Sequence, residues 1–197
     1  MKTAIIATLV GASLLAGAYA QAQAPTRIRG TISALSGDVL AVNGSDGRKV
    51  DVQIGDKTNI VFAQPIPIAE IKPGDFLGVT SVKRNDGTLT AYDVRRFPKP
   101  VNPGHRPFDG GENQTMTNAA VSANVESTKG RELVLSYEGG LQKVHVADTA
   151  AIASIVPGQR SQLVPGSYVS LTAAPESDGK FTARNIEVRK DAPKVPR

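Results

Sequence analysis

The chemistry open to this chain is narrow, because it has two histidines and no cysteine. His105 lies near Asp109 and Glu112, so one stretch offers an imidazole and two carboxylates. With one histidine per region and no cysteine, the chain falls far short of a closed transition-metal site. His145 stands between two valines, an alternation that predicts a solvent-facing strand position. We therefore expect no metal site and no cofactor, with His105 and Asp109 as weak candidate ligands.

Covalent or acid-base catalysis has no sequence signal. The chain contains neither a Gly-x-Ser-x-Gly nucleophile elbow nor a His-Glu-x-x-His motif. Four of its aspartates, Asp38, Asp46, Asp86 and Asp178, stand beside a glycine, where short carboxylates bond the backbone of a turn. We expect a protein that is not an enzyme.

Binding is the remaining chemistry, and it calls for exposed aromatic and basic side chains. The net charge of +5 is spread along the chain. A thin excess of this kind favours solubility over a dedicated nucleic-acid groove. Binding of an anionic envelope polymer through basic strands stays an alternative. The candidate ligand- or partner-binding residues are His105, Arg106, Phe108, Tyr92 and Arg95, with Tyr92 expected to be exposed.

These residues are positioned by a repeat. The stretch 71–94 recurs ninety-two positions later as 163–186, where Pro73-Gly74 returns as Pro165-Gly166. The repeated residues are turn formers, strand starters and apolar core positions. What is not repeated is the segment that carries His105, so we look there first for function.

Short alternating strands fill both copies. Ile28, Gly30 and Ile32 alternate with polar neighbours, and Asn43 to Gly47 is a hairpin signal. An odd step in the apolar pattern of strand 88–96 predicts a β-bulge. We expect an all-β chain of two small OB-like, partly closed β-barrels, with small β-sandwiches as the alternative.

The expected domains follow from the repeat and from composition. The first barrel is predicted at 25–98 and the second at 118–190. A Pro/Gly-rich linker is expected at 99–117, semi-rigid and extended because of its prolines. Residues 191–197 are expected to be a disordered tail.

The first twenty residues are typical of a secretory signal peptide. Lys2 precedes an uncharged apolar run that ends in small residues, and Ala18-Tyr19-Ala20 fits the cleavage rule. We expect cleavage after Ala20, with sites up to Ala24 as alternatives. The mature chain is then a soluble periplasmic or secreted protein with no membrane span.

Several motifs resemble a known family. Gly30-Thr31-Ile32, the stretch 71–75 and the stretch 86–91 resemble the β-rich repeats of a domain-of-unknown-function family in exported bacterial proteins. The stretches 104–109 and 115–119 resemble the middle of its proteobacterial, periplasmic two-repeat subfamily. The resemblance covers nearly the whole mature chain.

That subfamily has no established activity, so the resemblance implies a fold and a compartment but no catalytic residue. Some relatives carry the label of a metal ABC transporter permease. A permease needs several apolar spans, and this chain lacks them. Other members tend to have Trp in the His-Arg-Pro motif where this chain has Phe108.

The sequence thus predicts an exported, non-catalytic binding or interaction module. Its expected partner is an envelope protein or a small ligand, and not a nucleic acid. A periplasmic metal-binding accessory protein is a further alternative.

Overall fold

The computed structural model describes residues 24–109, 111–127, 130–176 and 180–196. The predicted signal peptide lies outside these residues. Within them the chain forms strands and two single-turn 3-10 helices, so the all-β prediction is confirmed. The elements in chain order are β1 (Thr26–Ser36), β2 (Val39–Gly44), β3 (Lys49–Gln53), β4 (Asn59–Pro65), η1 (Ile68–Glu70), β5 (Phe76–Lys83), β6 (Leu89–Phe97), β7 (Gly104–Pro107), β8 (Gln114–Ser127), β9 (Gly130–Tyr137), β10 (Gly140–Pro157), η2 (Arg160–Gln162), β11 (Tyr168–Pro175) and β12 (Phe181–Arg189).

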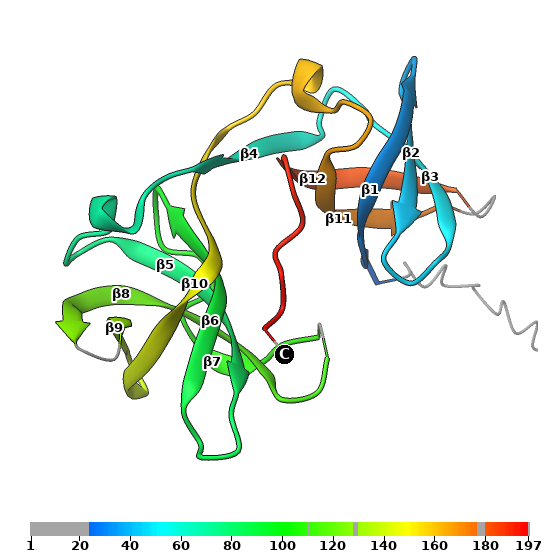
Figure 1. Cartoon of the computed structure of the whole chain (residues 1–197). Coiled ribbons are helices and arrows are strands. Elements are labelled where there is room, and N and C mark those ends of the chain that lie inside the picture. The colour runs from blue at the N-terminus through cyan, green and yellow to red at the C-terminus, as the bar shows by residue number, and fades with distance from the viewer. Residues whose placement is uncertain (1–23, 110, 128–129, 177–179, 197) are drawn as a thin grey trace, which may run out of the picture.

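The first barrel contains strands from both ends of the chain. β1, β2 and β3 form an antiparallel meander, β3 runs parallel to β12, β12 pairs with β11, and β11 returns to β1. In Figure 1 these five strands form the lobe that contains both blue and orange ribbons. Closure leaves none of the five as a free edge along its paired length.

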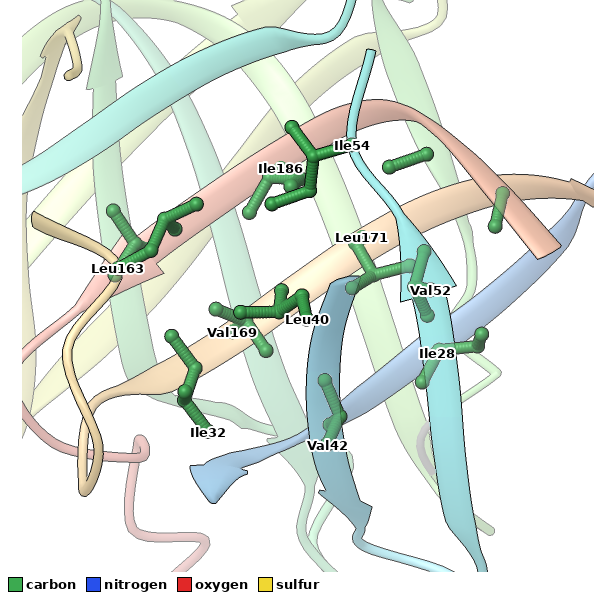
Figure 2. Packing of buried hydrophobic residues seen from close by; sticks show 13 residues of the cluster. Ile28, Ile32, Leu40, Val42, Val52, Ile54, Leu163, Val169, Leu171 and Ile186 are labelled. Atoms are coloured by element: carbon green, nitrogen blue, oxygen red, sulfur yellow. The ribbon is translucent and has the colours of Figure 1, made fainter. Parts of the chain in front are cut away.

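Apolar side chains from the two ends of the chain share the interior of this barrel. Ile32 and Leu40 come from the opening strands, whereas Val169, Leu171 and Ile186 come from the closing hairpin. Figure 2 shows these side chains converging between the ribbons. All five are at most 1% exposed, so the core of this barrel depends on β11 and β12.

A second circuit of pairings joins β8, β9, β10, β6 and β5, and β5 returns to β8. Its core includes Leu77, Leu133, Leu135 and Val144. The predicted barrel of residues 25–98 is therefore not the unit that these pairings close. Strands β1 to β3 lie in one circuit, and β5 and β6 lie in the other.

The two barrels meet where β4 pairs with the second half of β10. Ala63 faces Ile155 in this antiparallel pair. Ala63, Ala153 and Ile155 form a small buried cluster, against which Val61 and Phe97 pack. We call this region the joint. Figure 1 shows β4 and β10 crossing between the two lobes there.

The predicted linker is more structured than expected. β7 pairs with β8 in antiparallel register, from Gly104 opposite Asn118 to Pro107 opposite Thr115. β7 lies wholly and β8 partly within 99–117, so this segment folds back as a hairpin instead of running extended. The strand order ends at β7, which makes it an edge strand.

The predicted bulge is confirmed. The register between β5 and β6 shifts between Thr80 and Ser81, opposite Asp93 and Ala91, so Tyr92 is the extra residue. β11 and β12 show a shift between Thr172 and Ala173.

Among the described residues, no helix has the length and apolar character that a membrane crossing requires.

Candidate functional site

Four charged side chains form an ion cluster at the joint: Asp93, Arg95, Glu187 and Arg189. Arg95 Nη1 lies 3.0 Å from Glu187 Oε2, and its Nε lies 3.4 Å from Asp93 Oδ2. Arg189 contacts the same two carboxylates, at 2.8 Å from Asp93 and 2.6 Å from Glu187. Each side chain is 16% exposed or less. Two cations and two anions therefore neutralise each other away from solvent.

Each carboxylate of this cluster contacts both guanidinium groups. Burial raises the pKa of Glu187, but the guanidinium groups of Arg95 and Arg189 outweigh burial and hold the pKa below its ordinary value. Glu187 is therefore a paired anion. Removing one member of such a cluster leaves a buried charge without its partner, which is destabilising. The predicted ligand-binding residue Arg95 thus connects β6 to β12.

Tyr92 is buried, at 4% exposure, so the prediction of an exposed stacking side chain is wrong. The bulge in β6 turns this ring away from solvent. Its hydroxyl donates a hydrogen bond to Gln114 Oε1 at 2.6 Å. Burial, followed by the nearby Asp93 charge, raises the pKa of Tyr92 to about 12.

Phe108 and Asp109 fasten the β7 segment to the first barrel. Arg29 Nη2 on β1 lies 2.6 Å from Asp109 Oδ1, and Arg27 approaches the same oxygen at 3.7 Å. The Arg29 guanidinium also lies 4.9 Å from the centre of the Phe108 ring. Burial raises the pKa of Asp109, but the hydrogen bond and charge of Arg29 lower it more. Both residues thus hold the β7 segment against β1.

His105 and Arg106 lie on β7 and are exposed. The Nδ1 atom of His105 is 2.8 Å from Thr117 Oγ1, and its ring stacks on Tyr137 with a centroid distance of 6.5 Å. Arg106 donates to the carbonyl of Asn102 at 3.1 Å. A hollow of about 430 Å³ lies beside His105, between Pro103 and Glu138. Partial burial lowers the pKa of His105, which favours the neutral ring.

In the described part of the chain, no three His, Cys, Asp or Glu side chains gather as a metal site would require. The structure thus separates the predicted site residues. Arg95 and Phe108 lie in contacts between the two barrels. Tyr92 bonds Gln114 within the second barrel, and His105 and Arg106 lie at the edge of that barrel.

A groove of about 410 Å³ opens beside the joint. Its walls come from the chain between β4 and η1, the middle of β10, and the chain that follows β12. The apolar part includes Ile66, Ile68, Ala150 and Ile152. Isoleucine, alanine and proline line most of it, so its inner surface favours an aliphatic group.

The rim of the groove carries charged side chains of both signs. Arg131, Arg189, Lys190 and Asp191 line it. Arg131 already contacts Asp148 at 3.3 Å, and Arg189 belongs to the ion cluster. Lys190 is exposed and, in the described ranges, has no ion-pair partner. It is thus the cation at this rim that remains open to a ligand.

Sequence reasoning missed this groove, because the segments that form its walls, 63–68 and 150–153, lie far apart in the chain. The available signal was the small and apolar residues of both segments, such as Pro65 and Ile66 in the first and Ala150 and Ile152 in the second. Only the fold brings these segments together, since Ile66 donates its backbone N–H to the carbonyl of Ile152 at 3.1 Å.

Residues 29–95 match the model of a domain of unknown function, DUF5666. The matched stretch runs from β1 to β6 and therefore contributes strands to both barrels. It supports the resemblance to a domain-of-unknown-function family for this part of the chain. No curated protein and no solved structure matches the chain.

Proposed function

We propose that the protein is an exported, non-catalytic binding module, built from two copies of one OB-like repeat, that takes a small ligand in the groove beside the joint. The export signal in residues 1–20 supports a periplasmic or secreted location. The repeat of 71–94 as 163–186 supports the two-copy origin. In both circuits the third strand of the meander, β3 or β10, runs parallel to the second strand of the hairpin that closes it, β12 or β6, as in five-stranded OB-type barrels.

The groove is the observation that carries this proposal. Its volume of about 410 Å³ lies within the range of about 300–1,000 Å³ typical of small-molecule sites. Such sites combine apolar walls with a few polar groups that orient the ligand. Here Ile66, Ile68 and Ile152 supply apolar walls, and Lys190 supplies a cation at the rim.

The ligand class that fits is a small amphipathic anion, with an aliphatic part and a carboxylate or phosphate group. An aliphatic chain gains by leaving water for the apolar walls. Its anionic end gains a charge-assisted contact with Lys190. The arrangement favours this ligand over an anionic polymer on the strands, because Arg29 and Arg95 are already engaged in ion pairs.

Calorimetric titration with dodecanoate tests the proposal. The intact mature chain should bind dodecanoate and bind dodecanol, which lacks the charge, more weakly. Lys190→Glu should weaken dodecanoate binding about tenfold or more, equivalent to about 1.4 kcal/mol. Lys49→Glu, a change at an exposed lysine on β3, is the matched control and should leave binding unchanged.

Filling the groove tests its location. Ala150→Trp should abolish dodecanoate binding, whereas Ala41→Trp, on the outer side of β2, should not. Absence of heat and of any thermal shift for the unmodified chain would overturn the proposed function. Equal affinity of the Ala150→Trp and unmodified chains would move the site elsewhere.

A further inference from the structure

Strand pairs in one barrel recur in the other, ninety-two positions apart. Gln53 faces Thr182 in the parallel pair of β3 and β12, and His145 faces Thr90 in the parallel pair of β10 and β6. Each residue of the first pair lies ninety-two positions from a residue of the second. The meander β1–β3 of the first half (24–98) thus pairs with the hairpin β11–β12 of the second half (114–190). In the same way, the meander β8–β10 of the second half pairs with the hairpin β5–β6 of the first.

The joint lies at the centre of this relationship. Ala63 faces Ile155, which is the residue ninety-two positions after it. The neighbouring pair of Val61 and Pro157 corresponds to the pair of Ala153 and Pro65, because Ala153 lies ninety-two positions after Val61 and Pro157 ninety-two positions after Pro65. A local two-fold axis therefore passes through the pair of Ala63 and Ile155, as in an isologous dimer interface.

We infer that the two halves have exchanged their C-terminal hairpins, and that the open meander β1–β3 can accept β11–β12 from a second copy of this chain as it accepts its own. The partner is thus a second copy, and the surface is the pair of strand edges on β1 and β3 that β11 and β12 occupy. The inference rests on the two-copy repeat of the proposed function, but not on the groove or its ligand.

The shared cores make the exchanged contact strong. In the first barrel, Ile28, Ile32, Leu40, Val42, Val52 and Ile54 come from the first half, and Leu163, Val169, Leu171, Ala173, Ala183, Ile186 and Val188 from the second. Separating the halves would expose both sets to water. Each large apolar side chain that stays buried favours association.

Charge at the joint selects unlike halves. Arg95 and Glu187 occupy equivalent positions, ninety-two residues apart, yet carry opposite charges and meet at 3.0 Å. Two first halves arranged about the same axis would bring two copies of Arg95 together, and two second halves would bring two copies of Glu187 together. The attraction between Arg95 and Glu187 therefore favours association of a first half with a second half. Repulsion between like charges disfavours association of two identical halves.

Cutting the full chain tests the exchange. A protease site inserted after Gly111 allows the folded protein to be cut between the halves. The two fragments should remain together at the mass of the intact protein in size-exclusion chromatography with light scattering, and should separate only in denaturant. Separation of the fragments in native buffer would overturn the inference. This measurement uses no ligand, so failure of the groove proposal would leave its result unchanged.

Engineered cysteines report which hairpin closes the barrel. Arg27 faces Thr172 across β1 and β11. Facing residues lie within disulfide reach, so Arg27→Cys with Thr172→Cys should link the two fragments of the cut chain. Thr80 lies ninety-two positions before Thr172, so Arg27→Cys with Thr80→Cys is the matched control for a half that closes on itself. A disulfide in the control pair only would overturn the exchange.

Exchange with a second copy is measured by mixing. Tagged and untagged cut chains, unfolded and refolded together, should yield complexes in which a tagged first half is joined to an untagged second half. Arg95→Glu should reduce that yield several-fold, and Arg95→Glu with Glu187→Arg should restore it. Two outcomes would overturn the assignment of the partner. One is that complexes of two first halves or two second halves form as abundantly as complexes of a first half with a second half. The other is that no complex joins a tagged half to an untagged one.

Discussion

The two barrels share one pairing scheme but reach the joint in different ways. In the first barrel, the chain turns between β3 and β4, where Gly55 donates its N–H to Thr58 Oγ1 at 3.0 Å and that hydroxyl donates to the Ala183 carbonyl at 2.8 Å. In the second barrel, β10 continues as one strand through a register shift between Val146 and Ala151. The same change of strand direction is thus made by a polar turn in one barrel and by an irregular strand in the other.

The difference also extends to the surroundings of the barrels. The second barrel carries the added strand β7, and β7 leads to Phe108 and Asp109, which contact β1 of the first barrel. The irregular part of β10 forms one wall of the groove. The irregular part of β10 therefore lies at the joint, which is where we place both ligand binding and the contact between halves.

The largest expected effect comes from separating the barrels at their ion cluster. Arg189→Ala leaves Asp93 and Glu187 buried without one of their two cations, and should lower the free energy of unfolding by about 3–5 kcal/mol. Guanidinium denaturation followed by circular dichroism measures it. Arg184→Ala, on the exposed side of the same strand, is the control and should change stability by less than about 0.5 kcal/mol. Equal effects of the two changes would show that the cluster does not hold the barrels.

Truncation of core side chains tests whether the two barrels unfold independently. Leu171→Ala in the first core and Leu77→Ala in the second should each cost about 2–5 kcal/mol, because both side chains are 1% exposed or less. Each core contains residues from both halves of the chain. Either change should therefore lower the midpoint of a single unfolding transition and should not split it into two. Two separate transitions in either variant would show that the barrels unfold alone.

Acid should weaken the joint before it weakens the cores. The folded-state pKa of Glu187 lies below its ordinary value of 4.5, so its stabilisation is complete above that pH and is lost as the pH falls through the folded pKa. The denaturation midpoint should therefore fall below about pH 4.5. Glu187→Gln should flatten this dependence, whereas the exposed Glu112→Gln should retain it. An unchanged slope in Glu187→Gln would contradict the assignment.

The smallest effect is expected where the β7 segment meets the first barrel. Phe108→Ala removes the ring under Arg29 and should cost about 0.5–1 kcal/mol. Asp109→Asn removes a largely exposed ion pair and should cost about 0.2–1 kcal/mol. Thermal denaturation at low and high salt separates them, because salt should reduce only the effect of Asp109→Asn.

Local patterns in the sequence predicted local structure well. The alternation around Ile28 and Ile32 correctly indicated inward side chains, and the odd apolar step correctly indicated the bulge next to Tyr92. The exposure of Tyr92 was predicted wrongly, because a bulge changes side-chain direction in a way that composition does not reveal.

Long-range pairing could not be read from the chain. Two similar hairpins present similar strand edges, so sequence alone does not say whether β5–β6 or β11–β12 closes the first barrel. The partner of Arg95 is Glu187, ninety-two residues away, and no local spacing indicates it. The groove was not predicted for the same reason, because its walls come together only when each half pairs with the hairpin of the other half.

Strand β7 also limits how far the sheet can extend. It covers the side of β8 opposite β5, where Thr115 to Asn118 would otherwise present unpaired backbone groups. β7 is only four residues long, and Pro107 has no N–H to offer. Short edge strands with proline and charged residues discourage pairing with another molecule. The segment 104–107 thus ends the sheet with an edge of a kind that disfavours addition of a neighbouring chain.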